Sequence, residues 1–93
     1  MAFVTIGSAI YQFIRDQGFE KRLKQADVFR LWKETAGDVI ADKAKPERMD
    51  NGVLFVRVRD AAWRNELVYL SEDLKKKINQ EVGMEIVRMI KFK

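Results

Sequence analysis

The chain has 93 residues, of which 47% are hydrophobic and 34% charged, the composition of one small globular domain covering residues 1–93. It has no cysteine and no histidine, which excludes disulfides, zinc fingers, and catalysis by a thiolate or an imidazole. Lys and Arg number 18 and Asp and Glu 14, and the net charge of +4 permits contact with nucleic acid or an acidic protein without requiring either. We therefore expect a non-enzymatic binding module with no cofactor and no metal.

The N-terminal part of the chain has the apolar spacing of two helices. A first helix, ending at Gln17-Gly18, is predicted by Ile6, Ile10, Phe13 and Ile14. A second helical face is predicted by Leu23, Phe29, Trp32, Ala36 and Ile40. Because Gly37 interrupts this series, we expect the helix to end near Ala36 and a short extra turn to run through Ala41.

The middle of the chain predicts a β-hairpin. Pro46 is excluded from a helix interior and suits an edge strand. Asp50-Asn51-Gly52 is typical of a tight hairpin turn, and Val53–Arg59 has the β-branched content of a strand. We therefore expect Ala44–Met49 and Val53–Arg59 to pair antiparallel.

The C-terminal part predicts a long helix and a last strand. Asp60 is a suitable N-cap, and Gly83 ends the helix expected over residues 61–82. The clearest apolar stripe in the chain supports this helix: Trp63, Leu67, Leu70, Leu74 and Ile78. Ser71 could instead cap a new helix, with a kink near residue 70. Residues 85–93 alternate loosely and are expected to form the strand.

This order, α-α-β-β-α-β, predicts an α+β fold in which helices cover one face of a three-stranded sheet. No apolar run approaches the ~20 residues of a membrane span, and the N-terminal residues lack the features of a signal peptide. We therefore expect a cytoplasmic protein with no membrane partner and no small-molecule substrate. The sequence contains no phosphate-binding glycine motif, and turn and cap roles account for Asp50 and Asp60.

The strand 53–59 has two different faces. Leu54, Val56 and Val58 share the face expected to meet the core. The other face carries Phe55, Arg57 and Arg59, and the last strand is expected to add Val87, Met89, Lys91 and Lys93 to it. An uncovered face of this kind could be solvated, dock a protein, or stack on and neutralise a nucleic-acid strand; the pattern leaves all three open.

Three further features allow two interpretations each. Trp32 and Trp63 lie on apolar stripes and are expected mainly in the core. Trp63 is one turn from its helix start and could instead anchor a partner, with Arg64 and Asn65 as a polar rim. The run Lys75–Lys77 is typical of a solvated helix face, and phosphate contact is the alternative.

The pattern resembles the DciA family of bacterial replicative-helicase loaders. The resemblance covers about Ile6 to Phe92 and is carried by W-K-E-T-A-G from Trp32 to Gly37, Pro46, N-G-V-L-F-V-R-V in the hairpin, A-A-W-R-N-E-L around Trp63, Glu66 and Leu67, and the terminal Ile86 and Ile90-Lys91-Phe92. It implies a fold similar to a type II K-homology domain. It also implies a role in DNA replication as an adaptor without ATPase activity that binds the replicative DNA helicase.

The chain departs from the related patterns in two ways. Many family members carry an extra basic segment that contributes to DNA binding and that this sequence lacks, so DNA stays open as a second partner. No glycine pair has the G-x-x-G spacing of a true K-homology RNA binder. We expect Trp63, Arg64, Arg57, Arg59 and Lys91 to contact the partner. The alternative function is a small module that binds RNA or single-stranded DNA through these basic residues and the Lys75–Lys77 run.

Overall fold

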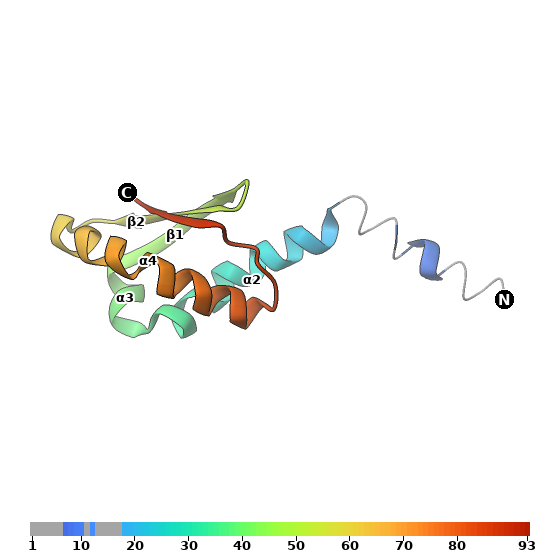
Figure 1. Ribbon diagram of the computed structural model, residues 1–93, viewed down its shortest axis with the longest axis horizontal. Coiled ribbons are helices and arrows are strands. Elements are labelled where there is room, and N and C mark those ends of the chain that lie inside the picture. The colour runs from blue at the N-terminus through green and yellow to red at the C-terminus, as the bar shows by residue number, and fades with distance from the viewer. Residues whose placement is uncertain (1–6, 11, 13–17) are drawn as a thin grey trace.

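The computed structural model describes residues 7–10, 12 and 18–93. Most of the first expected helix therefore lies outside the described residues. The remaining elements are α2 (Phe19–Ala36), α3 (Asp38–Lys43), β1 (Ala44–Asp50), β2 (Val53–Val58), α4 (Ala61–Val82) and β3 (Met89–Phe92). Figure 1 shows the strands in one layer and the helices in a second layer beneath it. The predicted α+β architecture, with helices on one face of a three-stranded sheet, is confirmed.

Glycine ends α2 where the sequence predicted. Gly37 has φ 90°, and its backbone N–H donates to the Lys33 carbonyl at 3.0 Å, after which α3 adds the expected extra turn. The buried side of α2 differs from the prediction, because Val28 and Leu31 join Trp32 in the core while Leu23 is 53% exposed and Phe29 is 36% exposed. The first turns of α2, which include Leu23, extend past the sheet (Figure 1).

The hairpin forms as predicted. Asn51 and Gly52 both have positive φ, 53° and 81°, which is the geometry of a two-residue turn matched to the strand twist. β1 is an edge strand, where the missing N–H of Pro46 is tolerated. The register shifts between Pro46 and Arg48, so that Glu47 lies in a β-bulge.

α4 is one unbroken helix. The Asp60 carboxylate accepts hydrogen bonds from the backbone N–H groups of Ala62 and Trp63, at 2.8 and 3.3 Å, and thereby caps its first turn. The alternative helix start at Ser71 is wrong, since Ser71 Oγ donates to the Val68 carbonyl within the same helix. Leu70 leaves the predicted stripe and is 39% exposed.

β3 is shorter than the predicted strand and runs parallel to β2, with Leu54 paired to Ile90. The preceding residues turn inward instead. Asn79 on α4 holds the backbone of Val87 through two hydrogen bonds of 2.9 Å, one in each direction. Val87 is consequently only 1% exposed, so the prediction that it lies on the uncovered sheet face is wrong.

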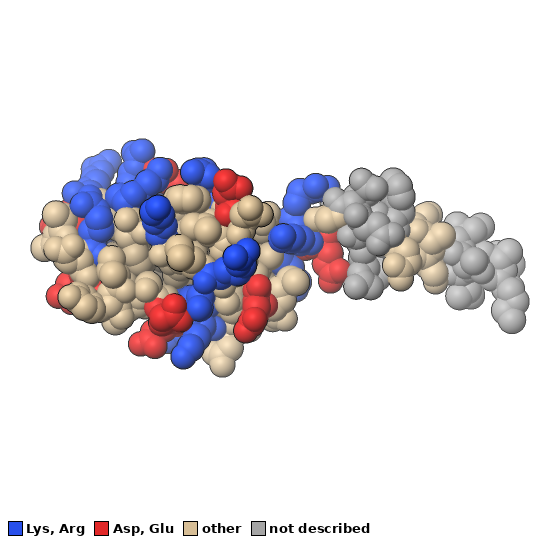
Figure 2. Space-filling view, turned by 45° about the horizontal axis from the view of Figure 1, so that its top comes forward, with Lys and Arg blue, Asp and Glu red and all other residues tan. Residues whose placement is uncertain are grey.

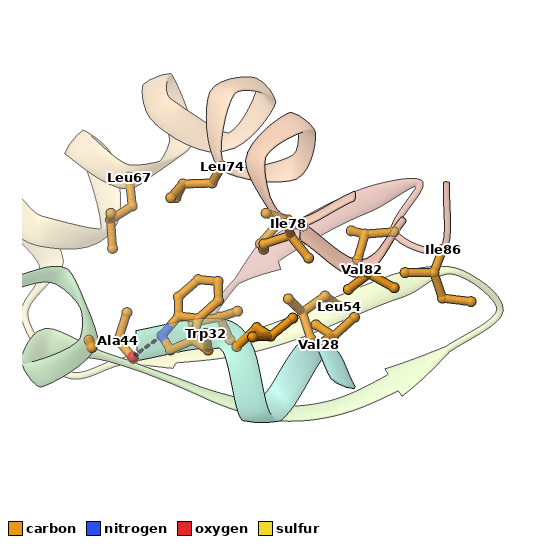
Figure 3. Close-up of a cluster of buried hydrophobic side chains, with 14 of the residues drawn as sticks. Val28, Trp32, Ala44, Leu54, Leu67, Leu74, Ile78, Val82 and Ile86 are labelled. Carbon is orange, nitrogen blue, oxygen red and sulfur yellow. Dashed lines mark hydrogen bonds between the residues drawn. The ribbon is translucent and has the colours of Figure 1, made fainter. Parts of the chain in front are cut away.

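The core lies between the sheet and the helices α2 and α4 (Figure 3). Side chains from β2 meet those from both helices there, and Leu54, Leu67 and Ile78 are fully buried. Trp32 is 3% exposed, and its indole Nε1–H donates to the Ala44 carbonyl at 2.9 Å. This bond satisfies the only polar atom of the Trp32 side chain and fixes α2 against the start of β1.

Candidate binding surface

The sheet face turned away from the helices is a mixed apolar and basic surface. The register places Arg48 beside Phe55, and Phe55 beside Lys91, on this side. We call this surface the open face and define it by Lys45, Glu47, Arg48, Asp50, Val53, Phe55, Arg57, Met89, Lys91 and Lys93. Figure 2 shows Lys and Arg side chains gathered where β2 ends and the C-terminus lies. Basic residues from all three strands therefore share one exposed surface.

Phe55 is the half-buried aromatic at the centre of the open face. The guanidinium carbon of Arg48 lies 4.0 Å from the centroid of its ring, and Lys93 Nζ lies 6.0 Å away. Both distances are within the range of cation–π attraction. Because Arg48 already covers the ring, a nucleic-acid base has less access to it than the sequence pattern indicated.

Glu47 links all three strands through its carboxylate. Its Oε1 contacts Arg57 Nε on β2, and its Oε2 lies 2.9 Å from Lys93 Nζ, just after β3. The hydrogen bond from Lys93, together with the positive charges of Arg57 and Lys93, holds the pKa of Glu47 below its ordinary value of 4.5, although reduced hydration acts in the opposite direction. One carboxylate thus neutralises part of the charge of two cations.

Arg48 forms a separate ion pair with Asp50 at 3.4 Å, whereas other cations of this region have no such partner among the described residues. No ion pair is recorded for Lys45, Arg59 or Lys91 within the described part of the chain. Arg59 directly follows β2 and helps to line a hollow of about 420 Å³ together with Asp42, Lys43, Lys45, Glu47 and Arg57. Because four cations and two carboxylates surround this hollow, its excess of positive charge favours a ligand that carries an anionic group.

The structure brings together only part of the predicted site. Arg57 and Lys91 lie on the open face, and Arg59 lies at its end. Trp63 and Arg64 belong to α4 and not to this surface. Arg64 turns inward, where its Nη2 donates to the Val58 carbonyl at 2.8 Å, so it fixes the end of β2.

Trp63 is half-buried and packs against the core. The exposed part of its ring lines a second, smaller hollow of about 210 Å³ with Ala62, Glu66 and Leu70. A role in contacting a partner therefore stays a prediction for Trp63. Lys75, from the predicted charge run, pairs with Glu72 at 2.9 Å on α4, away from the open face.

Sequence reasoning missed the contribution of β1. Lys45, Glu47 and Arg48 supply much of the charge of the open face, and none of them was predicted to contact a partner. The Asn51-Gly52 turn was a usable signal, because a two-residue hairpin fixes which residues pair. The bulge at Glu47 then shifts that register and could not be deduced from the turn.

Among the described residues, no group of three or more His, Cys, Asp or Glu side chains could hold a metal ion. Within the same residues, no helix is long and apolar enough to cross a membrane.

The comparisons with known proteins agree on one family. Residues 5–92 match the family described as "Dna[CI] antecedent, DciA". A UPF0232 protein of Streptomyces coelicolor is 36% identical over 90 residues, which are 95% of this chain and 47% of that relative. A UPF0232 protein of Mycobacterium tuberculosis is 30% identical over 87 residues, 94% of this chain and 46% of the relative. The chain therefore spans about half the length of the curated relatives it matches.

Proposed function

This chain belongs to the DciA family, and we propose that it is a non-enzymatic adaptor that binds the replicative DNA helicase and assists its placement on DNA. The family description as an antecedent of Dna[CI] supports this context. An adaptor of this kind acts where the chromosome is replicated, so the proposal places the protein in the cytoplasm. Without ATP hydrolysis of its own, it acts by binding one conformation of the helicase more tightly than another.

The observation that carries the proposal is the open face, with unpaired cations around a half-buried aromatic. Lys91 lies on β3 beside Phe55, and Lys45 lies on β1 beside Arg57. Met89 is 56% exposed and adds apolar area. An apolar centre with a charged rim is the usual composition of a protein interface. We propose that this face, which includes Arg57 and is extended by Arg59, meets an acidic surface of the helicase, and that Arg64 contributes by holding the end of β2 in place.

The proposal is tested by titrating this chain against the replicative helicase of its own organism. We expect a complex at micromolar concentration, and Lys91→Glu should weaken it about tenfold or more by placing a carboxylate against an acidic partner. Lys21→Glu is the matched control, because Lys21 is an exposed lysine in the first turn of α2 and lies outside the open face. Absence of a complex, or equal loss in both variants, contradicts the proposal.

A nucleic acid is the second candidate partner, favoured by the hollow beside Arg59 with its four cations. If phosphates bind there, the logarithm of the affinity should fall with the logarithm of the salt concentration, with a slope of about −0.7 to −0.9 for each phosphate neutralised. Single-stranded DNA and RNA oligonucleotides provide the probes, and Arg59→Gln should reduce the slope by about one phosphate. No measurable binding at low salt removes this candidate.

A further inference from the structure

The two edges of the sheet differ in how readily a further strand can be added to them. At the β1 edge, Pro46 has no N–H group to donate, and the bulge at Glu47 interrupts the regular ladder. Both features oppose pairing with another strand. β3, at the other edge, contains no proline, and its register with β2 has no bulge. An open edge of this kind can accept an extended segment of another protein.

The hydrogen bonds of β3 show which of its backbone groups point outward. Lys93 N–H donates to the Val56 carbonyl at 2.9 Å, and the Lys93 carbonyl accepts from Val58 N–H at 2.7 Å. In a parallel pair only every second residue bonds to the same neighbour, so the N–H and C=O groups of Ile90 and Phe92 point away from β2. Within the described part of the chain, no hydrogen bond is recorded for these outward groups. They are therefore available to a fourth strand.

An exposed apolar side chain lies on the flank of α4 that follows β3. This flank is tied to the strands at both ends, since Arg64 Nη2 donates to the Val58 carbonyl and Asn79 holds the Val87 backbone. α4 therefore runs along β3 beneath the sheet (Figure 1). Val68 lies about three helical turns before Asn79 on the same flank, and it is 55% exposed. A strand added to β3 would cover Val68 from above.

We propose that β3 accepts an extended segment of a partner protein as a fourth strand, in which acidic and apolar side chains alternate. The backbone of this segment bonds to the outward N–H and C=O groups of Ile90 and Phe92. Its acidic side chains lie on the open face beside Lys91, and its apolar side chains lie on the opposite side, above Val68. The inference rests on the proposed function for its acidic partner, and it specifies the form in which part of that partner binds.

Charge favours this occupant over a second copy of the chain or a nucleic acid. Lys91 is exposed next to the edge, and no ion pair is recorded for it within the described residues. Pairing β3 with β3 of a second copy would bring lysines of both strands together, and like charges on adjacent strands repel. A phosphodiester backbone has no row of N–H donors, so it would leave the outward carbonyls of Ile90 and Phe92 without partners.

The first test titrates the chain with a short synthetic peptide in which Glu and Val alternate, followed by heteronuclear NMR. The amide resonances of Ile90 and Phe92 should shift and their hydrogen exchange should slow, with a dissociation constant of about 1 mM or below. A peptide of the same composition, with all Glu before all Val, is the control. No binding of the alternating peptide at about 5 mM overturns the proposal. Equal binding of both peptides, or shifts confined to residues away from β3, also overturns it.

Two further peptides distinguish backbone pairing from charge attraction alone. One carries N-methyl groups on its Glu residues and the other on its Val residues, so that each can donate hydrogen bonds from only one of its two edges. One methylated peptide should lose binding about tenfold or more and the other should bind nearly as before, because only one edge faces β3. Loss with methylated Val indicates an antiparallel strand, and loss with methylated Glu a parallel strand. Equal binding of the two peptides overturns the proposal.

A charge reversal tests the predicted contact with Lys91. Lys91→Glu should weaken binding of the alternating peptide about fivefold, because an attraction across adjacent strands becomes a repulsion. Lys21→Glu is the matched control and should leave the affinity unchanged, and equal loss in both variants contradicts the proposal.

The peptide experiments contain no helicase, so their outcome is separate from that of the helicase titration. A helicase complex without peptide binding overturns the added strand and leaves the proposed function standing. Peptide binding without a helicase complex supports the site on β3 and contradicts the helicase as its partner.

Discussion

Glu47 and Lys93 form an ion pair across the whole width of the sheet. Glu47 lies in the bulge of edge strand β1, Lys93 follows the opposite edge strand β3, and their side chains meet at 2.9 Å over the intervening strand. Arg57 of β2 contacts the same carboxylate. The strands are therefore joined on the open face by side chains as well as by the backbone ladder, and this cluster leaves Lys45 and Lys91 as the free cations of the face.

The first prediction concerns the pH dependence of this cluster. Because the pKa of Glu47 is lowered in the folded chain, its ionised form stabilises the fold at pH values above its unfolded pKa, near 4.5. This contribution is lost as the pH falls through the lower folded pKa. Urea unfolding should therefore show Glu47→Gln less stable than the original chain at pH 7, with the difference vanishing in acid. Glu85→Gln, at an exposed position, should show no such trend.

Trp32 provides a test of the core. Trp32→Phe keeps most of the apolar volume but leaves the buried Ala44 carbonyl without its donor, which should lower the free energy of unfolding by about 1–3 kcal/mol. Trp32→Ala should cost about 3–5 kcal/mol, because it also opens a cavity. Denaturant titration measures both changes. Phe29→Leu, on the exposed side of α2, is the control and should change stability little.

Substitution of Trp63 can distinguish a role of this side chain in core packing from a role in contacting the partner. Its ring is half-buried, so Trp63→Ala should cost about 1–2 kcal/mol, clearly less than Trp32→Ala, and the chain should remain folded at room temperature. Helicase affinity of the folded variant then reports on the predicted contact. A loss of stability as large as that of Trp32→Ala would identify Trp63 as a core residue.

Asn79 is expected to control where β3 begins. Asn79→Ala removes both hydrogen bonds to the Val87 backbone and should lower the free energy of unfolding by about 2–3 kcal/mol. Hydrogen exchange should accelerate at Val87 and along β3. Gln80→Ala, at the exposed neighbouring position, should leave both quantities nearly unchanged. Unchanged exchange in Asn79→Ala would show that burial of Val87 alone holds this segment.

The elements that could be predicted are those set by local chemistry. Gly37 ends α2, Asn51-Gly52 forms the hairpin turn and Asp60 caps α4. Each of these residues supplies a positive φ or a capping hydrogen bond that the backbone requires within a few residues of it. The one-sided covering of the sheet also followed from element order. The Glu47 cluster did not, because it requires the bulge and three strands to meet.

Sequence alone therefore determined the α+β order, the hairpin and the two contrasting faces of β2, since spacing and turn residues act over short distances. Tertiary structure alone decided that Val87 is buried, that Arg64 holds the end of β2 and that Leu23 faces solvent. Each of these depends on which distant segment lies opposite the side chain. A local pattern shows which side of a helix or strand is apolar, but a side chain on that side is buried only where another element packs over it.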